Sequence, residues 1–208
     1  MLEDKSNIEK QVQTIFPRVI GIDEVNVCSY FGEVVVVGVI LPKKIGVEVC
    51  DSKLLREHEI EKCAKRLIEN VEYFIDYVSP KQCDKSLLKY EYGAIKRICI
   101  KAKPDFVFVD FHSIPNRFHI PQWGYKGGDS ELWCVAAASI IAKYTWNELC
   151  KQYHLTYPEY NLIGNKGSFG NQLFDLTKEH GLTKFHRHNW IKSACGKKSI
   201  DFNTIKIL

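Results

Sequence analysis

An almost unbroken apolar run, residues 19–25, leads into two adjacent carboxylates, Asp23 and Glu24. Runs of this kind are typical of buried β-strands, and buried strands do not normally end in paired anions. Neighbouring like charges repel, and loss of water raises the free-energy cost further. A divalent cation would remove both costs, whereas a solvated turn at the strand end is the plainer alternative. Asp23 and Glu24 are therefore candidate metal ligands whose partners must lie elsewhere in the chain.

Two further acidic residues also border apolar segments of the chain. Residues 105–110 form a second short apolar run after the breaker Pro104, and this run ends in Asp110. Asp129 precedes an apolar, Ala-rich segment that predicts a buried helix over residues 130–150. At or near the N-cap of that helix, the dipole and the free N–H groups favour an ionised carboxylate.

Together these positions give four carboxylates at two strand ends and one helix start. In an open α/β sheet such ends can converge on one edge. Mg²⁺ prefers oxygen ligands and keeps several waters, so a few carboxylates suffice to bind it. Two such ions, roughly 3.5–4 Å apart, would clamp the attacking and leaving oxygens of a phosphodiester.

The order of the remaining elements predicts an α/β domain. Strands are expected near residues 18–25, 33–41 and 71–78 and up to Asp110, with helices near 56–70, 81–102, 130–150 and 171–180. Residues 111–128 are expected to form a loop rich in aromatic residues and glycine. With 208 residues and no linker, the chain is predicted to form a single domain over residues 18–208, preceded by a polar N-terminal extension, residues 1–17.

Further motifs occur between and after these acids, in a fixed order along the chain. They are Tyr30-Phe31-Gly32, Ser52-Lys53-Leu54, Ala136-Ala137-Ala138-Ser139, Tyr157-Pro158-Glu159-Tyr160, Asn165-Lys166-Gly167 and His186-Arg187-His188. On this ordered set the chain resembles the type 2 ribonucleases H, the HII and HIII group. The resemblance implies an α/β, ribonuclease H-like fold, a mixed sheet flanked by helices with a helical C-terminal part. It also implies endonucleolytic hydrolysis of the RNA strand of RNA–DNA hybrids.

The same resemblance assigns roles to residues. It implies that Mg²⁺ or Mn²⁺ is bound by Asp23, Glu24, Asp110 and Asp129. Asp129 is typical of the HII branch, whereas Val25 and Tyr30-Phe31-Gly32 are more like HIII, so the branch stays open. Substrate contacts are implied for Asn26, Val27, Cys28, Ser52, Lys53, Lys143, Lys166, Phe169 and Arg187. For Ser52 a helix cap, and for Lys143 a surface lysine, are the plainer alternatives.

Two departures from the family pattern concern recognition of the ribose. Asn26, Val27 and Cys28 replace a Gly-x-Gly turn whose backbone approaches the 2′-hydroxyl in the family, and Val27 and Cys28 lack the conformational freedom of glycine. Phe169 stands near the position of a tyrosine and has no hydroxyl to offer. Because the 2′-hydroxyl distinguishes RNA from DNA, we expect weak or absent cleavage at a single ribonucleotide embedded in DNA and activity on longer hybrids.

Positive charge is concentrated near the C-terminal end. Six basic residues against the single acid Glu179 give residues 178–198 a net charge of +5, compared with +4 for the whole chain; they are Lys178, Lys184, Arg187, Lys192, Lys197 and Lys198. Such a segment can be a solvated basic tail. With the family resemblance, contact with duplex phosphates is the better interpretation.

The eight cysteines are at least thirteen residues apart, so the chain has no Cys-x-x-Cys motif. Cys99 and Cys134 lie in apolar surroundings and are expected to be buried thiols. Without a signal peptide or a long apolar run, the protein is predicted to be cytoplasmic, with no membrane association and reduced cysteines. It is expected to act as a monomer on RNA–DNA hybrid duplexes. Two rival functions stay open: a catalytically weak nucleic-acid binder, or a DNA nuclease on the same fold.

Overall fold

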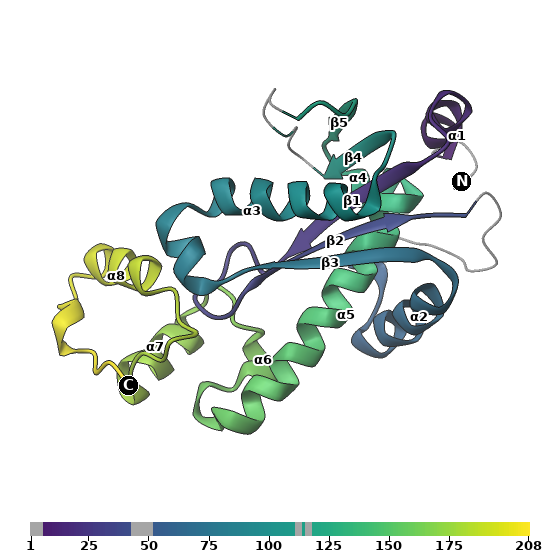
Figure 1. Cartoon of the computed structure of the whole chain (residues 1–208). Helices are drawn as coiled ribbons and strands as arrows, with labels where there is room; N and C mark the ends of the chain where they lie inside the picture. The colour runs from purple at the N-terminus through teal and green to yellow at the C-terminus, as the bar shows by residue number, and fades with distance from the viewer. Residues whose placement is uncertain (1–5, 43–51, 111–113, 115–117) are drawn as a thin grey trace. The chain divides into compact units, whose positions relative to one another are not determined.

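Figure 1 shows the computed structural model of the chain, which describes residues 6–42, 52–110, 114 and 118–208. The chain divides into two compact units. The first comprises Met1–Val25, Val35–Asp76 and Tyr92–Tyr144, and the second comprises Asn26–Val34, Tyr77–Glu91 and Thr145–Leu208. The described part of the predicted extension, residues 6–17, groups with the first unit, and the predicted single domain over residues 18–208 stays a prediction.

A five-stranded mixed sheet is the framework of the first unit. In sheet order its strands are β3 (Glu72–Val78), β2 (Val34–Ile40), β1 (Val19–Val25), β4 (Phe106–Asp110) and β5 (Gln122–Tyr125). β1 pairs with β2 in antiparallel and with β4 in parallel orientation. β1, β2 and β4 are almost entirely buried, as their continuous apolar runs predict. The predicted mixed sheet is therefore confirmed.

Helices cover both faces of this sheet, and two glycines let them approach closely. A Cβ added at Gly21 of β1 would lie 2.4 Å from the backbone of α5 (Trp133–Thr156). A Cβ added at Gly38 of β2 would lie 2.7 Å from Ile98 of α3 (Pro80–Ala102). Gly21 pairs with Val39, so Gly38 projects to the other face. α5 and α3 therefore lie on opposite faces of the sheet (Figure 1).

One further helix of the first unit agrees closely with its sequence pattern. α2 (Glu57–Asn70) was expected near residues 56–70, and it buries Ile60, Ala64 and Leu67 on one face. The short 3₁₀ helix η1 (Ser52–Leu54) precedes it. α3 follows the predicted range, but its backbone is not helical at Ser86 (φ −174°, ψ 91°), so the predicted continuous helix is interrupted there.

The start of the Ala-rich helix differs from the prediction. Asp129 lies in a separate one-turn helix, α4 (Gly128–Glu131), and Leu132 is extended before α5 begins at Trp133. The buried carboxylate of Glu9 accepts a hydrogen bond from the N–H of Cys134 at 3.2 Å. Glu9 belongs to α1 (Ser6–Ile15), a helix inside the predicted extension. The predicted cap at Asp129 is thus wrong, because a distant acid satisfies the first turn of α5.

A short strand was also missed. Residues 111–128 were expected to be a loop, yet β5 pairs in parallel with β4 inside that range. Its sequence, Gln-Trp-Gly-Tyr, has only four positions and includes a glycine, so it carries little strand signal despite its two aromatic residues. Residues 111–113 and 115–117 of the range lie outside the described residues.

The second unit is mainly helical, as predicted for the C-terminal part. After the end of α5 it contains η2 (Pro158–Tyr160), α6 (Leu162–Asn165), α7 (Asn171–His180), α8 (His188–Lys197) and η3 (Phe202–Thr204). α7 ends at Gly181, whose φ of 101° suits glycine, as expected from the sequence. Two apolar clusters form its core, one around Phe174, Leu182 and Ile191 and the other around Phe31 and Tyr160.

His186 is a buried polar side chain of the second unit, and its ring packs against Phe31 and Tyr160. Its Nδ1 accepts a hydrogen bond from the N–H of Thr183 at 3.0 Å, so the proton lies on Nε2, which faces Thr177 Oγ1 at 3.2 Å. Burial, more than the charge of His188, lowers the pKa of His186 to about 3. The folded unit therefore holds a neutral imidazole over a wide range of pH.

We expect Gly21→Ala to destabilise the protein by about 3 kcal/mol or more, because the new methyl group meets backbone atoms of α5 that cannot turn aside. Urea unfolding measures the loss. In Gly93→Ala, the matched control in α3, the added Cβ meets only the flexible end of Arg97 at 3.4 Å. That control should be neutral or gain up to about 1 kcal/mol. Equal losses in the two variants would contradict the close packing of β1 on α5.

The buried His186 also predicts a pH dependence. An unfolded histidine binds a proton below its ordinary pKa of 6.5, whereas folded His186 stays neutral down to about 3. Its contribution to stability is therefore complete above about pH 6.5 and is lost as the pH falls toward 3. Urea unfolding at several pH values should show a shallower acid-side slope for His186→Asn than for wild type. His58→Gln, which alters an exposed histidine, should keep the wild-type slope.

Candidate active site

The register of two parallel strands brings Asp23 and Asp110 together. Ile22 of β1 pairs with Val109 of β4, so the next residues along, Asp23 and Asp110, are neighbours on one face. Asp23 lies two residues beyond Gly21, and this face is therefore the one that α5 covers. Asp23 is only 6% exposed. The two acids predicted from separate apolar runs thus meet at the carboxyl ends of adjacent strands.

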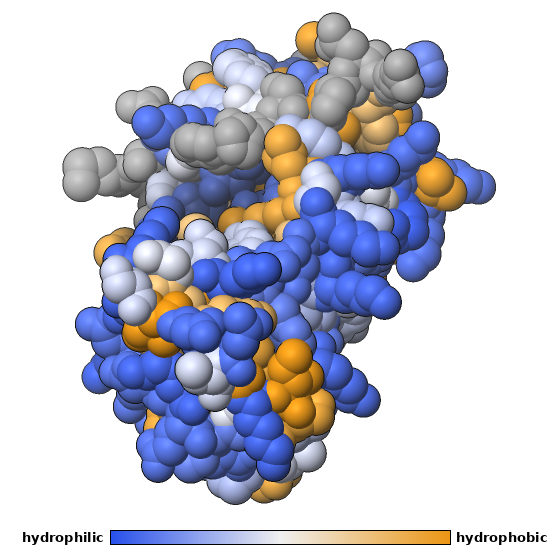
Figure 2. All heavy atoms as spheres, turned by 90° about the vertical axis from the view of Figure 1, so that its left-hand side faces the viewer, coloured by the Kyte–Doolittle hydropathy of each residue, from blue (hydrophilic) through white to orange (hydrophobic). Residues whose placement is uncertain are grey.

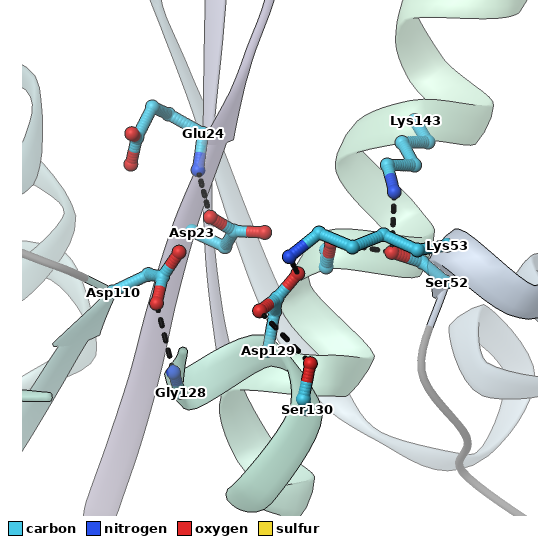
Figure 3. Close-up of polar contacts among 10 residues, drawn as sticks. Asp23, Glu24, Ser52, Lys53, Asp110, Gly128, Asp129, Ser130 and Lys143 are labelled. Atoms are coloured by element: carbon cyan, nitrogen blue, oxygen red, sulfur yellow. Dashed lines mark hydrogen bonds and ion pairs between the residues drawn. The ribbon is translucent and has the colours of Figure 1, made fainter. Parts of the chain in front are cut away.

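Asp129 reaches the same place from a tight turn. The N–H of Gly128 donates to Oδ1 of Asp110 at 2.8 Å, which fixes the start of α4 beside β4. The preceding Gly127 has a φ of 79°, a conformation that favours glycine. Asp129, the next residue after Gly128, is 3% exposed. Figure 3 shows the carboxylates of Asp23, Asp110 and Asp129 turned toward one another from β1, β4 and α4.

Glu24 takes a different direction. As the strand neighbour of Asp23 it projects to the opposite face of the sheet. Its N–H donates to Oδ1 of Asp23 at 2.9 Å, and its Oε2 is buried. In Figure 3 its carboxylate points away from Lys53 and Asp129. The side chains of Asp23 and Glu24, which are adjacent in sequence, therefore point to opposite faces of the sheet instead of lying side by side.

Burial and mutual repulsion dominate the electrostatics of this cluster. Loss of water raises the pKa of Asp23 to about 7, and the charges of Asp110 and Asp129 add to the increase. Hydrogen bonds from Ser139 and from the N–H of Glu24 act in the opposite direction. The pKa of Asp110 is also raised, first by burial and then by the charge of Asp129. A group of anions held this way favours a bound cation.

Lys53 supplies a positive charge to the cluster. Its Nζ lies 2.7 Å from Oδ2 of Asp129, while 61% of the lysine side chain is exposed. The charge of Lys53 also lowers the pKa of Asp110, although less than burial and Asp129 raise it. The ammonium group therefore stands where a cation would balance the same carboxylates, on a side chain with freedom to turn away.

A hydrogen-bonded chain connects Asp23 to a second lysine. Nζ of Lys143 donates to Oγ of Ser52 at 2.6 Å, and the hydroxyls of Ser52 and Ser139 are 2.8 Å apart. Ser139 in turn hydrogen-bonds to Asp23. Sequence reasoning assigned no role to Ser139. The available signal was its spacing of four residues from Lys143, which places both on one side of α5.

The donor set fits a hard divalent cation. All the acids offer carboxylate oxygens, which Mg²⁺ and Mn²⁺ accept as ligands. Within the described part of the chain, no three acidic, histidine or cysteine side chains are already arranged around a common ion position. Lys53 holds Asp129, and Glu24 points elsewhere, so both side chains would have to turn for four carboxylates to share a cation.

The other predicted substrate residues lie in the second unit. Asn26 has a φ of 68°, and its side-chain N–H₂ donates to the carbonyls of Phe31 and Glu33 at 2.8 Å. Positive φ occurs neither at Val27 nor at Cys28, so the turn does not require glycine at those positions. Lys166 is half-buried with a φ of 52°, and the ring of Phe169 is 44% exposed.

The basic segment, residues 178–198, divides into exposed and buried charges. Its five lysines are exposed, and Figure 2 shows mainly hydrophilic side chains with small apolar patches on the side of the molecule that carries α7 and α8. Arg187 is fully buried, and its guanidinium donates to backbone carbonyls. A surface contact with phosphate, which the sequence led us to expect of Arg187, does not agree with this position.

Comparison with known proteins identifies the family. A family profile described as Ribonuclease HII matches residues 20–193. The chain belongs to the ribonuclease HII family. Ribonuclease HII of Caldanaerobacter subterraneus subsp. tengcongensis is 34% identical over 177 residues, which cover 83% of this chain and 73% of the relative. Ribonuclease HII of Salinibacter ruber is 31% identical over 183 residues, covering 84% and 92%.

Solved structures confirm the ribonuclease H-like fold. The ribonuclease H2 of Pyrococcus horikoshii OT3 superimposes with a TM-score of 0.73 at 21% identity, covering 89% of this chain and 99% of that one. Bst-RNase HIII in complex with Mn²⁺ gives a TM-score of 0.65 at 20% identity, covering 90% and 65%. At these identities the structures establish the fold alone. The sequence relatives, which are named ribonuclease HII, place the chain on the HII side.

Membership of this family confirms the predicted enzyme class, an endonuclease that acts on RNA in RNA–DNA hybrids. Cys99 and Cys134 are buried as expected, and the seven cysteines in the described ranges are free; Cys50 lies outside them. None of the described helices has the length and hydrophobicity needed to cross a membrane.

The position of Lys53 generates a prediction for metal binding. In Lys53→Gln the positive charge that competes for Asp129 is gone, so Mn²⁺ should bind roughly three- to tenfold more tightly in the absence of substrate. Titration calorimetry measures the affinity. Lys143→Gln removes the same charge from a lysine whose ammonium group donates to the Ser52 hydroxyl, and its effect should be smaller. Unchanged or weaker Mn²⁺ binding by Lys53→Gln would show that this lysine does not compete with the cation.

Proposed function

We propose that this chain is a metal-dependent endoribonuclease that hydrolyses the RNA strand of RNA–DNA hybrids, with Mg²⁺ or Mn²⁺ held by Asp23, Glu24, Asp110 and Asp129. The observation that carries the proposal is the convergence of three carboxylates from β1, β4 and α4 on one face of the sheet, those of Asp23 and Asp129 buried and that of Asp110 half-buried. Burying several anions together is unfavourable unless a cation joins them. The Mn²⁺ complex of Bst-RNase HIII, a structure with the same fold, agrees with this cofactor class.

When bound, a divalent cation would lower the pKa of an attacking water and neutralise charge on the phosphate and the leaving 3′-oxygen. The residues of the chain prepare for this chemistry. Ser139 and the N–H of Glu24 stabilise the ionised form of Asp23. Gly128 orients Asp110 through its N–H. No side-chain nucleophile is required.

Lysine residues would hold the nucleic acid backbone. Lys53 pairs with Asp129 in the free protein, and its largely exposed side chain can turn to a phosphate once a cation replaces it at the acids. Lys143 is held near Asp23 through the hydroxyls of Ser52 and Ser139. In the second unit, Lys166 and the exposed lysines of residues 178–198 supply further positive charge for duplex phosphates.

Selectivity for longer hybrids over a single embedded ribonucleotide is part of the proposal. Phe169 presents an exposed ring but no hydroxyl, so it can stack on a base or sugar without hydrogen-bonding. The turn at Asn26, Val27 and Cys28 keeps backbone donors, so the loss of recognition is expected to be partial. We further propose that the protein acts as a monomer in the cytoplasm, where its free cysteines would stay reduced.

A panel of substrates tests this function. With Mg²⁺ or Mn²⁺, we expect rapid cleavage of a long RNA–DNA hybrid, cleavage at least about tenfold slower at one ribonucleotide in DNA, and no cleavage of double-stranded DNA. Asp23→Asn should lower the rate by about 10³-fold, the scale expected when an electrostatic group of the reaction centre is lost. Gel assays with end-labelled substrates give these rates.

Asp105→Asn is the control for that experiment, because Asp105 is exposed and the amide can still accept the N–H of Arg18. It should cleave like wild type. Hybrid binding without cleavage would favour the nucleic-acid binder, and faster cleavage of DNA duplexes than of hybrids would favour the DNA nuclease. A single ribonucleotide cut as fast as a long hybrid would refute the proposed selectivity.

A further inference from the structure

Glu9 of α1 holds the start of α5 within the first unit. Its side chain is buried, and Oε2 accepts a hydrogen bond from the N–H of Cys134 at 3.2 Å. The N–H of Trp133 and the thiol of Cys134 also donate to this carboxylate, and Nε2 of Gln13 donates to Oε1 at 3.4 Å. The first N–H groups of a helix have no acceptor inside the helix. Glu9 therefore satisfies donors that would otherwise be left unpaired at a buried helix start.

Further contacts keep α1 against the first unit. Nζ of Lys10 lies 5.6 Å from the centre of the Trp133 ring. The ring of Phe16, directly after α1, packs against Phe106 of β4 at 5.0 Å between centroids. Burial raises the pKa of Glu9, whereas the donors at the start of α5 act in the opposite direction by stabilising its ionised form. The acid and the helix start thus stabilise each other.

The first turn of α5 contacts the segments that precede two of the acids. A Cβ added at Gly21 would lie 2.4 Å from backbone atoms of this turn, which therefore rests directly on β1, two residues before Asp23. A Cβ added at Gly128, the residue before Asp129, would lie 3.3 Å from a methyl group of Val135 in the same turn. No long, flexible side chain separates these segments. A displacement of the turn is therefore transmitted to its neighbours.

Asp129 depends on α5 more than the other acids do. Asp23 and Asp110 lie on β1 and β4, and the pairing of these strands holds them together. Asp129 lies in the one-turn helix α4, which only Leu132 separates from α5. The N–H of Leu132 donates to the carbonyl of Gly128 at 2.8 Å, and its own carbonyl accepts an N–H from the first turn of α5 at 2.8 Å. A shift in the start of α5 therefore moves Asp129 relative to the acids of the sheet.

We propose that Glu9 is a positioning residue for the reaction centre, which acts on Asp129 through the start of α5. The inference rests on the proposed function in that the cation is the one assigned there to the acidic cluster. Without the carboxylate of Glu9, the first N–H groups of α5 lose their acceptor, and the turn unwinds or moves to find another. Asp129 then loses its place beside Asp23 and Asp110. A helix that the sequence predicted to be a polar extension thus contributes to the site.

A double-mutant cycle on Mn²⁺ affinity tests this role, with Glu9→Ala and Asp129→Asn made in the full chain. In the wild-type background, Glu9→Ala should weaken Mn²⁺ binding about tenfold, the scale expected when a group that orients a metal ligand is lost. In the Asp129→Asn background the same change should matter less than about twofold, because the residue through which Glu9 acts no longer supplies a carboxylate. Titration calorimetry measures the four affinities.

Glu59→Ala is the matched control, because Glu59 also accepts a backbone N–H at a helix start, that of Arg56 at 2.8 Å before α2. It should keep the Mn²⁺ affinity of its parent in both backgrounds, even where it lowers the free energy of unfolding. Glu9→Gln keeps an oxygen that can accept the N–H of Cys134, so its Mn²⁺ affinity should stay within about threefold of wild type. With saturating Mn²⁺, kcat of Glu9→Ala on the hybrid should fall about tenfold while KM changes less than about twofold.

Equal losses of Mn²⁺ affinity in the two backgrounds would overturn the proposal, because Glu9 would then support the unit in general. Unchanged Mn²⁺ affinity in a folded Glu9→Ala variant would do the same. If that variant does not fold, Glu9→Asp takes its place in the cycle. Its carboxylate is one methylene shorter, and a loss of about threefold confined to the wild-type background is then the supporting result, its absence the contrary one. If wild-type protein binds Mn²⁺ but cleaves no hybrid, the proposed function fails while the cycle still tests Glu9.

Discussion

The parallel pairing of β1 with β4 is the constraint on which the acidic cluster depends. A shift of one residue in that register would move Asp110 to the opposite face from Asp23. Gly21 extends the same constraint to α5, because the absence of a side chain lets the helix backbone approach the strand. That approach places Ser139 within hydrogen-bonding reach of Asp23. The register of β1 with β4 and the close approach at Gly21 thus bring acids from two distant segments of the chain together in one site.

The acidic cluster combines burial with repulsion between like charges, and a nearby lysine partly offsets that repulsion. Asp23 and Asp129 are almost fully buried, and repulsion among the acids raises the pKa of Asp23. Lys53 offsets part of this repulsion from a largely exposed side chain, and an ion pair whose ammonium group stays in contact with water stabilises a protein less than a fully buried pair would. A weak internal counter-charge is well suited to a site that must exchange it for a divalent ion. A buried, rigid lysine in the same position would oppose that exchange.

Sequence reasoning succeeded where the signal was local. The strands β1, β2 and β4 and the helices α2 and α7 follow from runs of apolar residues, helical spacing and a glycine stop. The acids were found because carboxylates at the ends of apolar runs are unusual. Their convergence required long-range pairing, which no local pattern encodes, and here the family resemblance supplied the expectation.

The missed features all depend on partners that are distant in sequence. Glu9 caps α5 from 125 residues away, and this contact explains why the helix begins at Trp133 without a local capping residue. Ser139 looks like an ordinary small residue in an Ala-rich helix until Asp23 is placed beside it. β5 forms because β4 offers an unpaired edge to a segment whose four residues are too few to indicate a strand by themselves.

At the loop of Asn26, Val27 and Cys28, the absence of the family's glycines is weaker evidence for altered ribose recognition than the absence of a hydroxyl at Phe169. From the sequence, loss of glycine predicts a disturbed turn, since glycine is the usual residue for unusual backbone angles. In the structure the left-handed position belongs to Asn26, a residue type that tolerates it, and Arg187 holds the carbonyls that follow. The backbone donors therefore survive the substitution. The hydroxyl absent from Phe169 is not restored by the turn, because this residue supplies only an apolar ring, packed against Tyr30 and Trp190. Any weakness toward isolated ribonucleotides should accordingly trace to Phe169 and not to the turn.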